Sequence, residues 1–226
     1  MHKIELNPKV IERVMRRRGR LYAFEKLDPS KTALLAIDMQ NWMIDPALPS
    51  AVPYGTAIVG PVNAVADALR ARGGTVVWVK MIADDTALKE WSVFYDGVIA
   101  NQRQQFYDVL RADGPAGEIY PGMRVNCKDI ISLKTRYSCV LAQSSDLHQR
   151  LSERQIDTVI IAGAVTNVCC ESSARDAMMM NYRTIVLSDG CSAHTDEEHN
   201  ASLSNLLNMF ADIRLSEDVV NLLRAE

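Results

Sequence analysis

Short apolar runs alternate with amphipathic stretches along most of the chain. Runs rich in β-branched residues predict strands at 32–38, 75–80, 129–133, 158–162 and 184–187. Apolar residues at helical spacing predict helices near 60–72, 145–154, 168–181 and 197–210. Strands that alternate with helices in this way are typical of an α/β fold. We predict a three-layer, doubly wound and mostly parallel sheet of the Rossmann-like type.

Two segments depart from this alternation. Residues 8–20 place apolar side chains at helical spacing beside five arginines, which predicts a helical arm that is solvated or contacts another subunit. Residues 81–128 are rich in aromatic residues, glycine and proline, and we expect a helix plus long loops that cover the sheet edge. The predicted organisation is therefore an N-terminal arm at 1–30 followed by a single α/β domain at 31–226.

The composition narrows the classes of partner. Of the 226 residues, 48% are hydrophobic and 23% are charged, and the formal net charge is -3, so neither a nucleic acid nor an anionic membrane is expected as a partner. No apolar run reaches membrane-spanning length, and the first 26 residues are studded with charges, so we expect a cytoplasmic protein. The five cysteines are an odd number without framework spacing, which is typical of reduced thiols. We expect a small-molecule substrate and a homo-oligomer, a dimer or a tetramer.

Three polar residues follow predicted strands. Asp38 ends the first apolar run, Lys134 follows 130–133, and Cys169 comes shortly after 159–163. Ligands of open α/β sheets bind outside the carboxyl ends of the strands, so these side chains can share one site. Taken singly, each has a structural alternative, because a strand-end aspartate is often a cap and a buried cysteine is often a small apolar residue.

Nucleophilic attack by a cysteine would give each of these three residues a role. A loop at 164–167 turns directly into the predicted helix, so Cys169 lies at a helix N-terminus, where free N–H groups favour a thiolate and can form an oxyanion hole. Asp38 could move the thiol proton, and a buried Lys134 would stabilise the anionic forms. A Cys–His pair stays possible but is not favoured, because histidines are scarce: His2, His148, His194 and His199.

Three stretches carry a family resemblance: ALLAIDMQN at 33–41, LKTRYS at 133–138 and DTVIIAGAVTNVCCESSARDA at 157–177. They closely resemble the isochorismatase-like cysteine hydrolase superfamily, which includes nicotinamidases, N-carbamoylsarcosine amidases and ureidoacrylate amidohydrolases. The resemblance runs from about residue 31 to the C-terminus. It implies a catalytic triad of Asp38, Lys134 and Cys169. It also implies a cis peptide between Ala164 and Val165, with the N–H groups of Val165 and Cys169 as the oxyanion hole.

The resemblance also distinguishes between neighbouring residues. The nucleophile of the family follows the Thr-Asn-Val segment directly, which selects Cys169 over Cys170. The substrate-binding candidates around the site are Gln40, Asn41, Trp42, Trp91 and Tyr137. For Gln40 and Asn41 a structural role, satisfying loop backbone, is an equal alternative. Residues 139–143 depart from the usual aromatic pair of the family, so the size and polarity of the substrate stay open.

No metal and no other cofactor is expected. Metal-dependent nicotinamidases bring an aspartate and two histidines after the second strand, but residues 80–85 read KMIADD. The favoured activity is hydrolysis of a small carboxamide, carbamoyl or ureido substrate, with the ureidoacrylate and N-carbamoylsarcosine branch as the nearest model. Within enzymes, the alternative is isochorismatase-type vinyl-ether hydrolysis. Outside hydrolases, the chain could be a redox thiol protein that uses Cys169 and Cys170, a nucleotide-binding protein, or a non-catalytic scaffold. The first loop lacks the glycine-rich fingerprint of dinucleotide binding, which argues against the nucleotide-binding protein.

Overall fold

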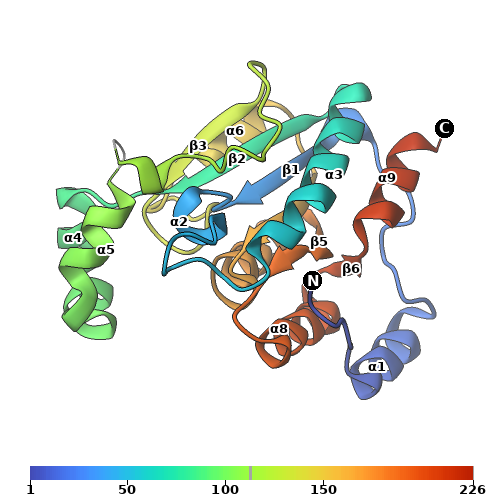
Figure 1. Ribbon diagram of the computed structural model, residues 1–226. Coiled ribbons are helices and arrows are strands. Elements are labelled where there is room, and N and C mark those ends of the chain that lie inside the picture. Colours follow the sequence, from blue (N-terminus) through green and yellow to red (C-terminus); the bar gives the residue numbers. More distant parts are fainter. Residues whose placement is uncertain (112–113, 226) are drawn as a thin grey trace.

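A six-stranded parallel sheet forms the centre of the molecule (Figure 1). The computed structural model describes residues 1–111 and 114–225. The sheet has the order β3-β2-β1-β4-β5-β6, and every neighbouring pair is parallel. Its strands are β1 (Thr32–Ile37), β2 (Thr75–Met81), β3 (Ile130–Lys134), β4 (Thr158–Ala164), β5 (Arg183–Ser192) and β6 (Asp212–Arg214). The predicted doubly wound α/β fold is confirmed.

Helices cover both faces of the sheet. On one face α3 (Val59–Ala71) packs against α9 (Ser216–Arg224) and contacts β1, β2 and β5. From β1 to β3 the chain moves towards one edge of the sheet, and after β3 it crosses back and moves towards the other edge. Because the crossovers are right-handed, this change of direction puts α6 (Leu147–Glu153), α7 (Glu171–Met179) and α8 (Asp196–Met209) on the other face. The strand pattern reflects this double cover, since every residue of β1 and of β4 is buried. Among the described residues, none of the helices combines the length and the apolar composition that a membrane span requires.

The edge strand β6 was not predicted from the sequence. Strand β6 has only three residues, and two of them, Asp212 and Arg214, are charged but buried. Asp212 is satisfied by the N-terminal arm, because its carboxylate accepts hydrogen bonds from the backbone N–H groups of Ala23 and Phe24, both at 2.9 Å, and from Arg18 at 3.0 Å. A buried charge that is paired only in the tertiary structure leaves no apolar run in the sequence.

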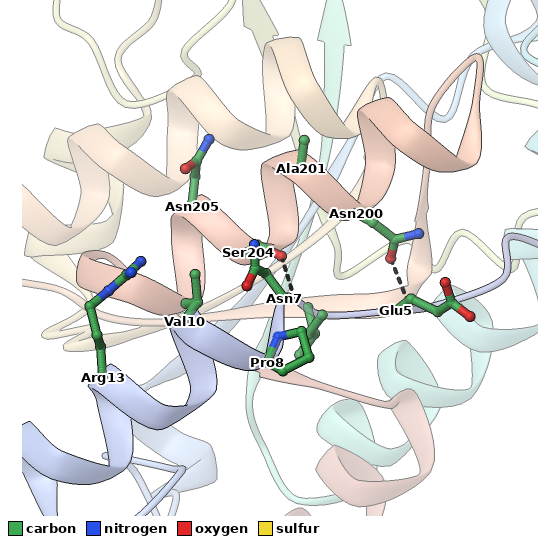
Figure 2. A pocket seen from close by; sticks show the side chains of 10 residues that line it. Glu5, Asn7, Pro8, Val10, Arg13, Asn200, Ala201, Ser204 and Asn205 are labelled. Atoms are coloured by element: carbon green, nitrogen blue, oxygen red, sulfur yellow. Dashed lines mark hydrogen bonds between the residues drawn. The ribbon is translucent and has the colours of Figure 1, made fainter.

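The arm is docked along the domain. Its helix α1 (Pro8–Arg18) begins after the cap residue Asn7 and packs on α8 with Val10 and Val14 buried. Figure 2 shows two of the contacts that precede this helix: the Glu5 N–H donates to Asn200 at 2.7 Å, and the Asn7 N–H donates to Ser204 at 3.1 Å. The predicted helical arm is therefore packed against its own domain.

The segment after β2 forms a helical excursion that projects beyond the sheet on the side of β3 (Figure 1). It contains more helix than the one helix and long loops expected from its sequence: α4 (Asp85–Glu90), η3 (Val93–Val98), η4 (Ala100–Gln102), α5 (Arg103–Leu110) and η5 (Pro115–Gly117). The remaining short elements are η1 (Pro29–Lys31), α2 (Asn41–Ile44), η2 (Gly55–Ile58) and η6 (Thr166–Cys170). Phe94 and Tyr95 of η3 are buried, so the excursion is packed against the domain at this point.

Candidate active site

The three strand-end residues meet at the reversal of the sheet. The chain winds outward from β1 in one direction to β2 and from β4 in the other to β5, so the crevice lies between β1 and β4. Asp38 follows β1 and Cys169 follows β4, one on each side of that crevice. Lys134 ends β3, two strands away from β1, and its long side chain crosses the end of β2 to reach them.

The Lys134 ammonium has three partners. It lies 3.0 Å from an Asp38 carboxylate oxygen and 3.3 Å from the Cys169 sulfur, and it donates to the Arg136 carbonyl at 3.2 Å. An ammonium has three protons, so this set uses its full donor capacity. Apart from the ion pair, neither carboxylate oxygen of Asp38 has a hydrogen-bond partner within the described ranges. The carboxylate therefore has free lone pairs beside the thiol.

Burial dominates the electrostatics of the triad. Asp38 and Lys134 are not exposed at all, and Cys169 is 3% exposed. Burial raises the pKa of Asp38 against the opposing pull of the Lys134 ammonium. Burial alone would lower the pKa of Lys134, but its interactions with Asp38 and with the Cys169 sulfur outweigh burial and raise it. Lysine and aspartate form the ion pair of the resting site, with a neutral thiol beside them.

The expected lowering of the Cys169 pKa at a helix N-terminus is wrong. Burial raises the pKa of this thiol, the Asp38 carboxylate raises it further, and the Lys134 ammonium opposes the shift. The helix begins differently from the prediction, since the widened turn η6 precedes α7 and contains Cys169. The thiol is therefore protonated at rest and must lose its proton to a neighbour during any reaction.

The backbone around these residues adopts rare conformations. Asp38 has a φ of 52°, in the left-handed region that few residues other than glycine, asparagine and aspartate enter. Gly163 pairs with Ile37 in the sheet and has a φ of 120°. A Cβ atom at Gly163 would lie 1.9 Å from the Ile37 carbonyl oxygen, so only glycine fits there. The peptide bond between Ala164 and Val165 is cis.

The comparisons with known proteins agree with this architecture. The model of the Isochorismatase domain matches residues 32–218. The chain belongs to the isochorismatase family. It is 27% identical over 210 residues to the ureidoacrylate amidohydrolase RutB of Acinetobacter baylyi, with 87% of this chain and 85% of the relative covered.

The chain is also similar to a second relative and to a solved structure. The chain is 30% identical over 180 residues to a "Probable inactive nicotinamidase" of Arabidopsis thaliana, covering 79% of this chain and 89% of the relative. Its fold superposes on a cysteine hydrolase from Pseudomonas syringae pv. phaseolicola with a TM-score of 0.81 and 25% identity, covering 90% and 97% of the two chains. The protein is thus an isochorismatase-family hydrolase whose family match begins after the arm.

The neighbouring cysteine of this isochorismatase-family site faces another way. Cys170 is fully buried, and its thiol meets that of Cys191, a contact that together with burial raises the Cys170 pKa. Both are free thiols, as is Cys169. The two adjacent cysteines therefore differ in environment, because only Cys169 contacts the lysine.

Aromatic side chains gather beside the triad. Tyr137 packs edge-on against Trp91 at 4.9 Å between ring centroids, and against Phe94 at 5.5 Å. The Arg136 guanidinium lies over the Trp91 ring, 5.1 Å from its centroid. Burial raises the pKa of Tyr137 to about 12, and the nearby Cys169 adds to this shift. Trp91 and Tyr137, both substrate candidates, are therefore joined in one cluster next to the thiol, while Phe94 and Arg136 were missed.

The other substrate candidates are engaged elsewhere. The Gln40 side chain is buried, donates to the carbonyls of Met81 and Gly117 at 3.1 and 2.8 Å, and accepts from the Met81 N–H at 2.8 Å. Asn41 donates to the Pro115 carbonyl at 2.8 Å. These contacts favour the structural role for Gln40, because loop backbone uses both of its polar atoms, whereas the buried Oδ1 of Asn41 has no hydrogen-bond partner among the described residues.

Trp42 contacts the helical excursion. Its ring packs edge-on against Phe106 at 5.8 Å and lines a separate cavity of about 200 Å³. The other lining residues are Pro49, Ser50, Gln102, Gln105, Phe106 and Val109. None of the three triad residues borders this cavity, and the substrate-binding role of Trp42 stays a prediction.

From the sequence, His199 was considered only as a disfavoured partner of the cysteine, and its actual place in the structure was not predicted. His199 of α8 is completely buried, and its Nδ1 lies 2.9 Å from the hydroxyl of Thr166, the first residue of η6. Burial lowers the pKa of His199 to about 4, and the neighbouring His2 contributes to the shift. The sequence showed only a histidine within a helix pattern, and nothing in its spacing pointed to the loop before Cys169.

Proposed function

We propose that this chain is a cysteine amidohydrolase that cleaves the C–N bond of a small carboxamide, carbamoyl or ureido substrate through a thioester. The observation that carries the proposal is the Lys134 ammonium, which contacts both the Asp38 carboxylate and the Cys169 sulfur in a buried site. The amidohydrolase activity named for the relative RutB supports the same reaction class.

The proposed first step moves one proton within the triad. Asp38 accepts the thiol proton while the Cys169 sulfur adds to the substrate carbonyl carbon. Before transfer the charges are one carboxylate and one ammonium; after transfer they are one thiolate and the same ammonium. The net charge of the buried triad stays at zero, so no uncompensated charge is created in a low-dielectric site.

The second half of the reaction returns the proton and releases the acid. Collapse of the tetrahedral intermediate breaks the C–N bond, and Asp38 gives its proton to the departing ammonia or amine. Water then loses a proton to Asp38 and adds to the thioester, and the thiol leaves reprotonated. In this proposal the N–H groups of Val165 and Cys169 bind the oxyanion in both halves.

A substrate screen tests the proposal. Purified protein is incubated with a panel of small amides, carbamoyl amino acids and ureido acids, and ammonia release is measured in parallel with Cys169→Ala. We expect release from at least one compound with the native chain and none with the variant. Release of pyruvate from isochorismate with full activity in Cys169→Ser would instead establish vinyl-ether hydrolysis. Absence of turnover across the panel, with no acyl adduct on Cys169, would favour a non-catalytic scaffold.

A further inference from the structure

A buried stack of two histidines joins the N-terminal arm to the loop that precedes the nucleophile. His2 of the arm lies parallel to His199 of α8, with ring centroids 4.2 Å apart and an interplanar angle of 10°. His199 in turn meets the Thr166 hydroxyl at 2.9 Å. Thr166 follows the cis peptide and Val165 directly and begins the turn that contains Cys169.

The hydrogen-bond partners fix the tautomer of each ring. His199 Nε2 lies 3.0 Å from the Ser188 carbonyl, which only accepts, so this nitrogen carries the hydrogen and Nδ1 accepts from the Thr166 hydroxyl. His2 Nε2 accepts from the Ala193 N–H at 2.9 Å, so its Nδ1 carries the hydrogen and donates to Asp196 at 2.7 Å. Both rings are thus held at both nitrogens.

Thr166 is held at two points from α8. Besides the bond between its hydroxyl and His199, its carbonyl accepts from the Ser202 hydroxyl at 3.3 Å. Thr166, His199 and Ser202 are all buried, with exposures of at most 2%. The start of η6 is therefore fixed by α8, and the orientation of one of these anchors, His199, depends on the ring of His2.

The arm is also attached by contacts that do not involve His2. Figure 2 shows Asn200 and Ser204 of α8 accepting from the Glu5 and Asn7 N–H groups. Asn200 also donates to the Lys3 carbonyl at 2.8 Å. Docking of the arm and support of His199 can therefore be separated by mutation.

We propose that His199 and His2 are positioning residues of the active site. This inference rests on the proposed function. His199 holds Thr166, and with it the loop that carries Cys169 and the N–H groups assigned to the oxyanion. The His2 stack holds His199 in the orientation that accepts the Thr166 proton. A displacement of about 1 Å in such a loop lowers turnover by up to about 10²-fold. The arm, which precedes the region of the family match, thus supports catalysis.

Kinetics of matched variants test the proposal, using the amide that gives the highest ammonia release. We expect His199→Leu and the isosteric Thr166→Val each to lower kcat by about 10- to 100-fold with little change in KM. The double variant should be no slower than either single variant, because both remove one interaction. His199→Asn, which can offer an acceptor near the same place, should recover part of the loss. His2→Ala should lower kcat by about 3- to 10-fold.

The matched control is Asn200→Ala, which removes arm contacts without touching the histidine stack. It should lower the thermal midpoint but leave kcat unchanged, whereas His2→Ala should lower both. An unchanged kcat in folded Thr166→Val and His2→Ala would overturn the proposal, as would strictly additive losses in the double variant. Thr166→Val preserves shape, so it serves if His199→Leu does not fold.

A second readout needs no substrate. The rate at which iodoacetamide alkylates Cys169, measured by peptide mass spectrometry, should change by about tenfold or more in Thr166→Val, while exposed Cys127 serves as the internal reference. An unchanged rate at Cys169 would count against the positioning role. Failure of the proposed function has a different signature, namely no amide turnover by the native chain or turnover that survives Cys169→Ala.

Discussion

The Lys134 ammonium and the Asp38 carboxylate lie 3.0 Å apart, and neither side chain is exposed to solvent. Removing one partner leaves the other buried without its counter-charge, which costs about 3–5 kcal/mol in comparable pairs. We expect Lys134→Met and Asp38→Asn each to lower the free energy of unfolding by about that amount at pH 8. Asparagine suits the left-handed backbone at position 38, so Asp38→Asn isolates the charge.

The double variant Asp38→Asn/Lys134→Met provides the control for this prediction. It contains no buried charge in the triad and should recover most of the stability lost in the single variants, while remaining inactive. Urea unfolding of the four proteins measures the coupling. If the losses simply add, the ion pair is not the source of the effect.

Activity should fall in acid with an apparent pKa above the ordinary aspartate value of about 3.9. Burial raises the pKa of Asp38, and only the ionised carboxylate can accept the thiol proton. Lowering the pH through that raised pKa therefore removes the active form, whereas raising the pH keeps it. A pH profile of kcat/KM measures this loss of activity at acidic pH and its apparent pKa.

The alkaline side of the same profile should stay flat well above neutral pH. Interactions with Asp38 and the Cys169 sulfur raise the pKa of Lys134 against the effect of burial, and burial raises the pKa of the thiol, so neither group loses its proton to solvent in the ordinary range. An activity that rises through the ordinary cysteine range, near pH 8.5, would show instead that solvent hydroxide and not Asp38 forms the thiolate.

The acyl group should be found on Cys169 and not on Cys170. Only the Cys169 sulfur contacts Lys134, at 3.3 Å, while the thiol of Cys170 faces Cys191. We expect Cys169→Ala to lower kcat by at least about 10³-fold, and Cys170→Ser to retain turnover at a modest cost in stability. Acid-quenched reactions analysed by peptide mass spectrometry locate the adduct. Its presence on Cys170 would contradict the assignment.

The central strands could be predicted because each is marked by a run of neighbouring apolar residues in the sequence. The apolar runs that became β1 and β4 are buried on both faces, and such strands leave continuous runs in the sequence. Strand β6 left none, because Asp212 and Arg214 are buried in partnership with the distant arm. The helices after β2 were harder still, since they are short and pack through scattered aromatic residues.

The active site also contains some residues whose role could be predicted from the sequence and others whose role could not. A position directly after an apolar strand marked Asp38 and Lys134, and the resemblance separated Cys169 from Cys170. The role of Gln40 could not be read, because its partners Met81 and Gly117 lie far along the chain. The pKa of Cys169 was mispredicted for the same reason: the helix end was visible in the sequence, but the burial and the facing Asp38 were not.

Gly163 is expected to be irreplaceable, and Gly163→Ala should destabilise the protein by about 3 kcal/mol or more. Its φ of 120° is unsuited to alanine, and the added Cβ would lie 1.9 Å from the carbonyl oxygen of Ile37, which immediately precedes Asp38. Because backbone and not a flexible side chain blocks the methyl group, β1 and β4 must separate to accept it. Any folded fraction should therefore also lose activity.

Gly60→Ala is the matched control. Gly60 lies in α3, and a Cβ atom there meets nothing within 4 Å, so the same substitution should be neutral or stabilise the helix by up to about 1 kcal/mol. Thermal and urea unfolding of both variants, with ammonia release as the activity readout, makes the comparison. A Gly163→Ala protein as stable and active as Gly60→Ala would show that the contact between β1 and β4 relaxes easily. The position of Asp38 would then not depend on the glycine beside it.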